Sequence, residues 1–128
     1  MKLYHYTSKS AFRRILSSGI KYGEIPVNAA ITLDYPWLTS SPAFIDQKWA
    51  DEDLHKTEVK LHVEIPGIDD CLNKWPNLAK ELLLTPLQYS AINCDCDPSH
   101  WYVYLGIIPP EWVTHVTYNK GSKYLIEG

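Results

Sequence analysis

The chain has 128 residues, of which 45% are hydrophobic and 21% are charged, and its formal net charge at pH 7 is −3. These values are typical of one globular domain over residues 1–128 and exclude an intrinsically disordered chain, which would hold fewer apolar residues and more net charge. The acidic balance also argues against general nucleic-acid binding, which needs a basic surface.

The first elements in chain order are a strand and a helix. Residues 2–6 alternate in polarity and are rich in aromatic side chains, which predicts a β-strand. Thr7 and Ser8 supply hydroxyls that can cap a helix, and apolar residues then recur at helical spacing. Gly19 suits the left-handed conformation that closes a helix. The sequence therefore predicts a strand, a cap, a three-turn helix and a glycine stop.

The next part of the chain predicts fewer regular elements. Residues 20–34 contain Gly, Pro and Asn without a clear period, and we expect a loop there. A short strand is expected over Trp37–Thr39 and a short helix over residues 42–50. Residues 58–65 alternate strictly, so one face of this strand, with Val59, is expected to be buried and the other, with Glu58, to face water.

The rest of the chain predicts one helix, one acidic loop and three strands, over residues 77–84, 93–99, 101–108, 112–118 and 123–126 in that order. Pro86 is expected to stop the helix, and residues 119–122 to form a hairpin turn. Runs of strands with one early and one middle helix predict the α+β class. We expect a small single domain with a split, mostly antiparallel β-sheet and two or three helices.

The opening strand carries the groups that best suit a ligand. A histidine inside a strand, followed by hydroxyls and a helix start, brings an imidazole, a phenol and backbone N–H groups around one ligand. Here these groups are His5, Tyr6 and the helix that follows Thr7, and residues 1–23 add five cations and no acid. The imidazole suits a ribose hydroxyl, the phenol suits a flat ring, and the backbone N–H groups suit a phosphate. The competing interpretation is a core histidine between packing aromatics.

The segment LYHYTSKSAFRRILSSGI, residues 3–20, resembles the first strand and helix of ADP-ribosyltransferase-like proteins, including the DarT-like and RNA 2′-phosphotransferase-like branches. The resemblance implies an ADP-ribosyltransferase-like fold and NAD as a substrate. It implies that His5 contacts the ribose of NAD and that Thr7 supports the neighbouring contacts. An aromatic residue near the second motif would stack on the nicotinamide ring, a role that falls to Trp37 or Tyr102.

Two later segments are similar to further motifs of that family. Residues 36–41, PWLTSS, resemble its second motif, whose hydroxyls support the nicotinamide ribose, and this implies Thr39, Ser40 or Ser41 in that role. Residues 101–104, WYVY, followed by 108–113, IPPEWV, resemble its closing pair of strands.

The sequence departs from the family at one position. Many NAD-consuming members carry a catalytic glutamate just before the strand that begins here at Trp101, where this chain has Ser99 and His100. Asp97 and Glu111 are the acids nearest to that place, and we take Glu111 as the candidate catalytic acid. The phosphotransferase-like branch dispenses with the glutamate and uses histidine and arginines, which makes Arg13, with Arg14, the candidate catalytic cation.

The resemblance thus implies a nucleotide-binding transferase of the glycosyltransferase class. The leading expectation is an NAD-dependent ADP-ribosyltransferase-like protein that modifies a protein or nucleic-acid acceptor. Two alternatives stay open. One is a non-catalytic protein that binds NAD or an ADP-ribose nucleotide, or inhibits a partner, without the catalytic glutamate. The other is a glutamate-independent RNA 2′-phosphotransferase-like enzyme.

Cysteines and tryptophans give weaker signals. Cys94, Cys96 and His100 are sensible zinc ligands, but Cys-x-Cys lacks the usual two-residue gap and no fourth ligand stands out, so we expect free thiols and no metal. A cysteine nucleophile activated by His100 or His62 is the other interpretation. Tryptophan is more often a core residue than a ligand platform. The chain nevertheless has five tryptophans, and we expect at least one of them to face a pocket: Trp37, Trp49, Trp75, Trp101 and Trp112.

The location of the protein is inferred from what the sequence lacks. No apolar run approaches the ~20 residues of a membrane span, and no secretory leader follows Met1. The three cysteines are an odd number and give no disulfide framework. We therefore expect a cytoplasmic protein with no membrane partner.

Overall fold

The computed structural model describes residues 1–28, 30–44, 47, 49, 54–94 and 96–119. Its α-helices are α1 (Lys9–Ser18), α2 (Trp75–Glu81) and α3 (Pro86–Asn93). Its strands are β1 (Lys2–Thr7), β2 (Glu24–Pro26), β3 (Thr32–Asp34), β4 (Trp37–Thr39), β5 (Val59–Glu64), β6 (Leu72–Lys74), β7 (Trp101–Tyr104) and β8 (Val113–Tyr118). Short 3₁₀ helices are η3 (Leu54–Thr57), η4 (Pro98–His100) and η5 (Pro110–Trp112).

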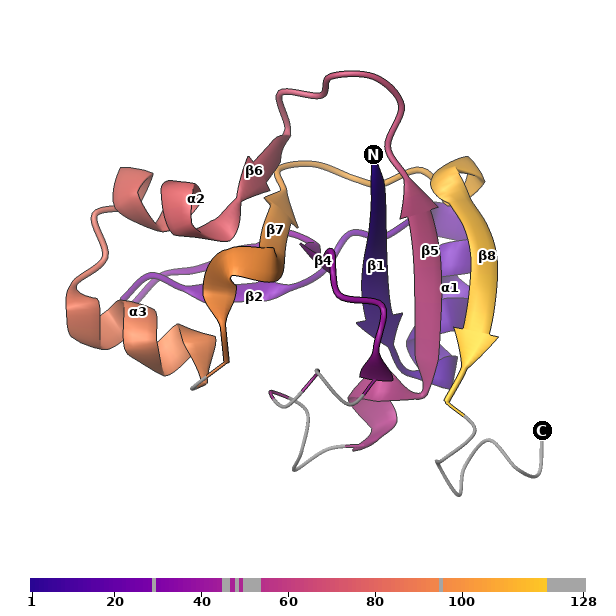
Figure 1. The fold of residues 1–128 in the computed structure, drawn as a ribbon, viewed down its shortest axis with the longest axis horizontal. Helices are drawn as coiled ribbons and strands as arrows, with labels where there is room; N and C mark the ends of the chain where they lie inside the picture. Colours follow the sequence, from indigo (N-terminus) through magenta and orange to yellow (C-terminus); the bar gives the residue numbers. More distant parts are fainter. Residues whose placement is uncertain (29, 45–46, 48, 50–53, 95, 120–128) are drawn as a thin grey trace.

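The strands form one large sheet and one hairpin. Six strands pair in the order β6-β7-β4-β1-β5-β8, and every neighbouring pair is antiparallel. Strands β2 and β3 pair with each other in a separate two-stranded sheet. Helix α1 lies behind β5 and β8, whereas α2 and α3 lie on the side of β6 and β7 (Figure 1). The expected small α+β fold with a mostly antiparallel sheet is confirmed.

The large sheet is weakest between β1 and β4. These strands share one register pair, Tyr4 with Thr39, whereas β1 and β5 share six pairs from Lys2 with Glu64 to Thr7 with Val59. Since each ladder pair contributes backbone hydrogen bonds, the sheet divides here into a β6-β7-β4 half and a β1-β5-β8 half.

The predicted unit of strand, cap and helix is present at the start of the chain. Ser8 is the N-cap of α1, and its hydroxyl accepts a hydrogen bond from the Ala11 amide at 3.1 Å. Gly19 ends the helix with a φ of 83°, in the region that favours glycine. A Cβ at Gly19 would lie 2.4 Å from the Ile108 carbonyl oxygen, so no larger residue fits there.

Two apolar clusters form the core. The first joins the inner face of α1, with Ile15, to sheet residues such as Leu3 and Leu61. The second joins Trp75 of α2 to Ile25 of β2 and to strand β7. Because alternate residues of a strand face opposite sides, neighbours in β4 and β7 divide between the two clusters.

Residues 20–34, expected to be a loop, instead contain the β2–β3 hairpin. Each strand has three residues, which is too short to show a period of two, and Pro26 within β2 disguises it further. Ile25 at the centre of β2 is fully buried against the cluster around Trp75, so tertiary packing stabilises the hairpin.

The helices of the second half also differ from expectation. Helix α2 begins at Trp75 and ends at Glu81, earlier than the predicted span of 77–84. Pro86 was expected only to stop a helix, but it is the first residue of α3. Thr85 and Gln88 form a capping box at the start of that helix. Proline fits the first helical turn because the N–H that it lacks has no partner there in any case.

The remaining elements partly follow the sequence pattern. Strand β7 ends at Tyr104 rather than at 108, β8 agrees with its prediction to one residue, and β6 was not expected. Much of the predicted helix over 42–50 lies outside the described residues, as do residues 120–128 of the predicted final turn and strand. Among the described helices, none has the length and apolarity to cross a membrane.

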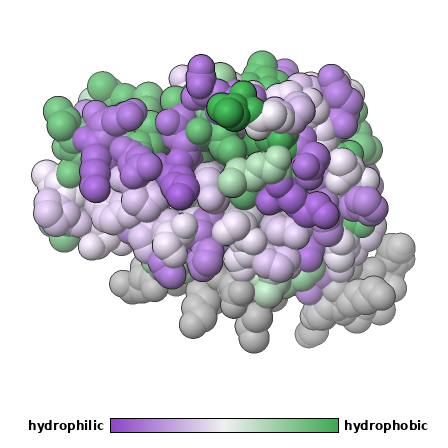
Figure 2. Space-filling view, turned by 45° about the horizontal axis from the view of Figure 1, so that its top comes forward, coloured by the Kyte–Doolittle hydropathy of each residue, from purple (hydrophilic) through white to green (hydrophobic). Residues whose placement is uncertain are grey.

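Large hydrophobic side chains that reach the surface are spread over several elements. Leu16 of α1, Ile68 before β6, and Leu83 and Leu87 around the α2–α3 turn are all mostly exposed. Figure 2 shows one face of the molecule, where hydrophilic side chains interrupt the hydrophobic ones.

Candidate functional site

A cavity of about 1100 Å³ is lined by elements from both halves of the sheet. Its wall includes residues of β1, the start of α1 and η3 on one side, and of β2, β4, β7, α2 and α3 on the other. Ligand pockets commonly enclose about 300–1,000 Å³. This cavity is therefore large enough for a ligand of dinucleotide size.

His5 bridges the weak junction between β1 and β4. Its Nδ1 lies 2.7 Å from the carbonyl oxygen of Trp37. Because a carbonyl oxygen can only accept, Nδ1 carries a proton and donates it. Burial lowers the pKa of His5 below its ordinary value, so the ring is neutral near pH 7. In this tautomer Nε2 is an acceptor, and His5 lines the cavity.

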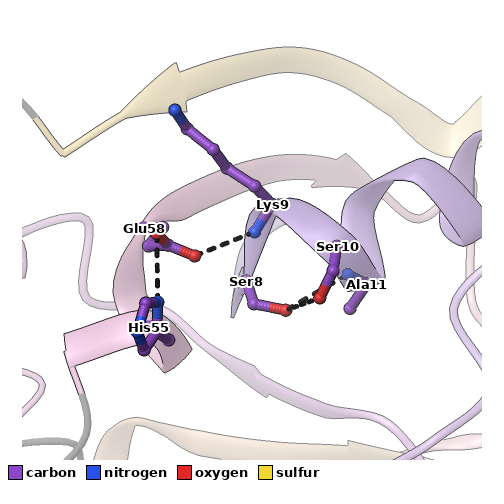
Figure 3. Close-up of polar contacts among 6 residues, drawn as sticks. All are labelled: Ser8, Lys9, Ser10, Ala11, His55 and Glu58. Carbon is purple, nitrogen blue, oxygen red and sulfur yellow. Dashed lines mark hydrogen bonds and ion pairs between the residues drawn. The ribbon is translucent and has the colours of Figure 1, made fainter. Parts of the chain in front are cut away.

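Glu58 is a buried carboxylate on the same wall. The residue is 4% exposed, and Oε1 accepts a hydrogen bond from the Lys9 backbone amide at 3.1 Å, in the first turn of α1. Oε2 lies 3.3 Å from His55 Nδ1. In Figure 3 the Lys9 side chain extends away from Glu58, so the backbone makes this contact. A negative charge there is favourable because the first amides of a helix point outward and carry partial positive charge.

The burial of Glu58 corrects the expectation that it faces water. Strict alternation over residues 58–65 separates two faces of a strand, but it does not show what covers each face. The start of α1 and η3 enclose Glu58, which lies just before β5. No periodicity in the sequence signals that enclosure.

Several predicted site residues also line the cavity: Tyr6, Thr7, Arg13, Trp37 and Thr39. The Tyr6 hydroxyl donates to the Ser41 carbonyl at 3.1 Å, and Thr39 Oγ1 accepts from the Ser41 amide at 3.1 Å. Thr7 is buried, whereas Arg13 is exposed. The structure thus brings His5 and these five residues to the lining of one cavity.

Three predicted site residues lie elsewhere. Ser40 is exposed, and its hydroxyl lies 3.1 Å from His100 Nδ1, outside the cavity. Tyr102 packs with the cluster under α1, because alternation turns it to the face opposite Trp101. Glu111 is exposed in η5, beside α1, and does not line the cavity. The buried acid on the wall is therefore Glu58, which the sequence motifs did not single out.

Asp97 and Arg14, two further polar candidates from the sequence, do not line the cavity either. The carboxylate of Asp97 accepts from the Ser99 amide at 2.9 Å and caps η4. Arg14, unlike Arg13, is not among the described residues that line the cavity.

Four of the five tryptophans line the cavity: Trp37, Trp49, Trp75 and Trp101. The rings of Trp37 and Trp75 lie 4.8 Å apart at 67°, and those of Trp37 and Trp101 lie 5.9 Å apart at 90°. The rings of Trp49 and Trp101 lie 5.9 Å apart at 72°. Edge-to-face pairs of this kind are favourable contacts between aromatic rings.

The sulfur atoms of Cys94 and Cys96 each contact a backbone carbonyl. Cys94 is the exposed left-handed C-cap of α3, with a φ of 50°, and it lines the cavity. Cys96 is half-buried, and its thiol contacts the Cys94 carbonyl. Within the described ranges no group of three or more His, Cys, Asp or Glu is placed to hold a metal ion.

No protein-family model matches this chain, and neither a curated protein nor a solved structure is significantly similar to it. A small α+β fold hosts many unrelated functions, so the fold class does not indicate one by itself. The residues on the cavity wall are what point to a function.

Proposed function

We propose that this protein is an NAD-dependent ADP-ribosyltransferase-like enzyme, which binds NAD or a related ADP-ribose nucleotide in the cavity and modifies a protein or nucleic-acid acceptor. The observation that carries the proposal is the neutral His5 and the buried Glu58 carboxylate on the wall of one cavity of dinucleotide size. The resemblance of residues 3–20 to the opening of ADP-ribosyltransferase-like proteins supports it independently.

The wall offers a partner for each part of such a ligand. Nε2 of His5 accepts a ribose hydroxyl, and the hydroxyls of Thr7 and Thr39 add polar contacts. Trp37 offers a ring for stacking. The start of α1 suits a phosphate less than the sequence suggested, because Glu58 already holds the Lys9 amide. The phosphates are therefore assigned to Arg13.

The proposed reaction breaks the bond between C1′ of the ribose and the nicotinamide nitrogen. Nicotinamide leaves with the bonding electron pair, and C1′ carries positive charge until a nucleophile of the acceptor bonds to it and loses its proton to water. Glu58 supplies the negative charge that stabilises this transition state, since a fixed charge in a buried site is strongly effective. His5 holds the ribose in position. Glu58 thus takes the role that the sequence assigned to Glu111.

A non-catalytic nucleotide-binding protein is the second candidate. Glu58 contacts both the Lys9 amide and His55. These contacts favour the second candidate because they also give Glu58 a structural role. This candidate predicts that NAD binds without release of nicotinamide. The RNA 2′-phosphotransferase-like alternative has less support, because Arg14 does not join Arg13 on the described wall.

The test combines NAD titration calorimetry with chromatography of released nicotinamide. We expect His5→Ala to weaken NAD binding, because the ribose loses its acceptor. We expect Glu58→Gln to retain NAD binding and to slow nicotinamide release by about 100-fold or more, the size of effect seen when one electrostatic contact to a transition state is lost. Glu111→Gln, a matched change outside the cavity, is the control and should retain the wild-type rate.

Three outcomes discriminate among the candidates. A wild-type protein that does not bind NAD contradicts both nucleotide-binding proposals. Binding without nicotinamide release contradicts the enzyme and supports the non-catalytic protein. Equal rates of release for Glu58→Gln and Glu111→Gln contradict the assignment of Glu58.

A further inference from the structure

Four tryptophans meet on the cavity wall at steep angles, and we call Trp37, Trp49, Trp75 and Trp101 the tryptophan box. Successive rings are inclined at 67° to 90° with centroids 4.8 to 5.9 Å apart, so they form adjoining walls rather than one stack. Three of the four, all except the fully buried Trp75, are half-buried, so part of each residue stays accessible.

The polar edges of three of these rings are already occupied. The indole N–H of Trp37 donates to the Glu24 carbonyl, that of Trp75 to Asn93 Oδ1, and that of Trp49 to Gln47 Oε1, at 2.7 to 3.0 Å. What these three rings still offer a ligand is therefore their faces. The face of an indole is electron-rich and attracts a cation more strongly than the face of any other side chain.

The charges of the cavity wall are divided between its two sides. Its cationic side chains come from α1 and η3, namely Lys9, Arg13 and Lys56, and the same side holds the Glu58 carboxylate. Among the described wall residues of β2, β4, β7, α2 and α3, the charged side chain is that of Glu24. Helix α3 also ends at this side, and a helix C-terminus carries partial negative charge. The side with the tryptophan box therefore favours positive charge.

We propose that the tryptophan box binds an organic cation whose charge is spread over a flat ring or a quaternary ammonium group. The identification of the natural cation as the charged nicotinamide ring of NAD rests on the proposed function, whereas the preference for a cation does not. Because cleavage of the C1′–N bond leaves nicotinamide neutral, the box attracts the substrate ring and releases the product ring. It therefore contributes to substrate binding rather than to the transition state.

The test compares two probes of the same ring, 1-methylnicotinamide, which is charged, and nicotinamide, which is neutral. Binding is measured by ligand-observed NMR titration of the full chain. We expect the charged probe to bind about tenfold more tightly, which is the affinity ratio that a desolvated cation–π contact supports. The same titration with tetramethylammonium shows whether a flat ring is required.

Variants locate the binding site. Trp101→Leu removes one face of the box and should abolish most of the preference for the charged probe, whereas Trp101→Phe keeps a ring and should retain part of it. Trp112→Leu loses an indole outside the cavity and is the matched control, with the preference unchanged. Thermal unfolding of each variant verifies that it is folded.

The outcomes separate this inference from the proposed function. Equal affinity for the two probes, failure of the charged probe to bind, or a preference that survives Trp101→Leu would overturn the tryptophan box as a cation site. A preference for the charged probe in a protein that does not bind NAD would overturn the proposed function and leave the box standing. NAD binding without a preference for the charged probe would overturn the tryptophan box as a cation site and leave the proposed function standing.

Discussion

The two sides of the cavity are held in place by different forces. On the polar side, formed by β1, α1 and η3, the functional groups are held by short directional contacts, such as that of His5 with the Trp37 carbonyl or of Glu58 with the Lys9 amide. On the aromatic side, Trp37, Trp75 and Trp101 hold one another by ring packing. A single hydrogen bond has a net value of about 1 kcal/mol, whereas burial of a large ring adds many small contacts.

This difference indicates that the two sides of the cavity have different roles. The aromatic side supplies stability and a surface for a ring, while the polar side supplies the charge and the acceptor that chemistry needs. The two sides meet where β1 and β4 share a single register pair. Four predictions test the contrast, from the largest expected effect to the smallest.

The largest effect is expected from Trp75→Ala on the aromatic side. Trp75 is 1% exposed and packs against Ile25 and Leu78, so its loss leaves a large void and an unpaired Asn93 amide oxygen. We expect the free energy of unfolding to fall by about 3–5 kcal/mol, as for other buried tryptophans. Equilibrium unfolding in urea measures it. The half-buried Trp112→Ala should cost less, and an equal cost would contradict the special position of Trp75.

A smaller effect is expected from Glu58→Leu on the polar side. The change removes the acceptor of the Lys9 amide in a buried place, which costs about 1–3 kcal/mol of unfolding free energy. Urea unfolding compared with Glu64→Leu, an exposed position at the far end of β5, provides the control. If both variants were equally stable, the carboxylate of Glu58 would not be holding the start of α1.

Ser8→Ala is expected to have a moderate effect. It removes the N-cap hydroxyl that accepts from the Ala11 amide, and loss of such a cap costs about 1 kcal/mol. Ser10→Ala is the control, since its exposed hydroxyl contacts the Ser8 hydroxyl and not a backbone amide. Hydrogen exchange at Ala11 should accelerate in Ser8→Ala alone. Faster exchange in both variants would argue against a specific cap.

The smallest effect is expected from the titration of His5. Because burial lowers the pKa of His5 below 6.5, the unfolded chain binds its proton more readily than the folded protein does. Stability is therefore fully present above pH 6.5 and falls as the pH drops below 6.5 towards the folded-state pKa. His5→Gln should reduce this slope in urea unfolding measured over that range. An unchanged slope would show that His5 is not buried as a neutral ring.

Local sequence patterns predicted the polar side in large part. Ser8 and Gly19 set the ends of α1, and His5, Tyr6 and Thr7 stand within one strand, so their proximity needs no long-range contact. The short strand Trp37–Thr39 was predicted as well, and it adds two residues to the wall. The assignment of these residues to NAD stays a prediction.

Tertiary structure decided the rest. Glu58 lies on the wall and Glu111 does not, because the covering of a strand end by α1 and η3 is a contact between distant segments. Helix α3 was missed because Pro86 signals both the end of one helix and the start of the next. The four tryptophans of the box come from separate segments, between residues 37 and 101, and are brought together by packing.

The sequence by itself therefore determined the class of the fold, the opening strand and helix, and the residue types of one side of the cavity. Only the tertiary structure decided which acid is buried and which rings share one wall. The physical reason is that periodicity and capping report interactions over a few residues, which a local pattern records. A cavity is formed by residues that approach one another only after the elements have packed.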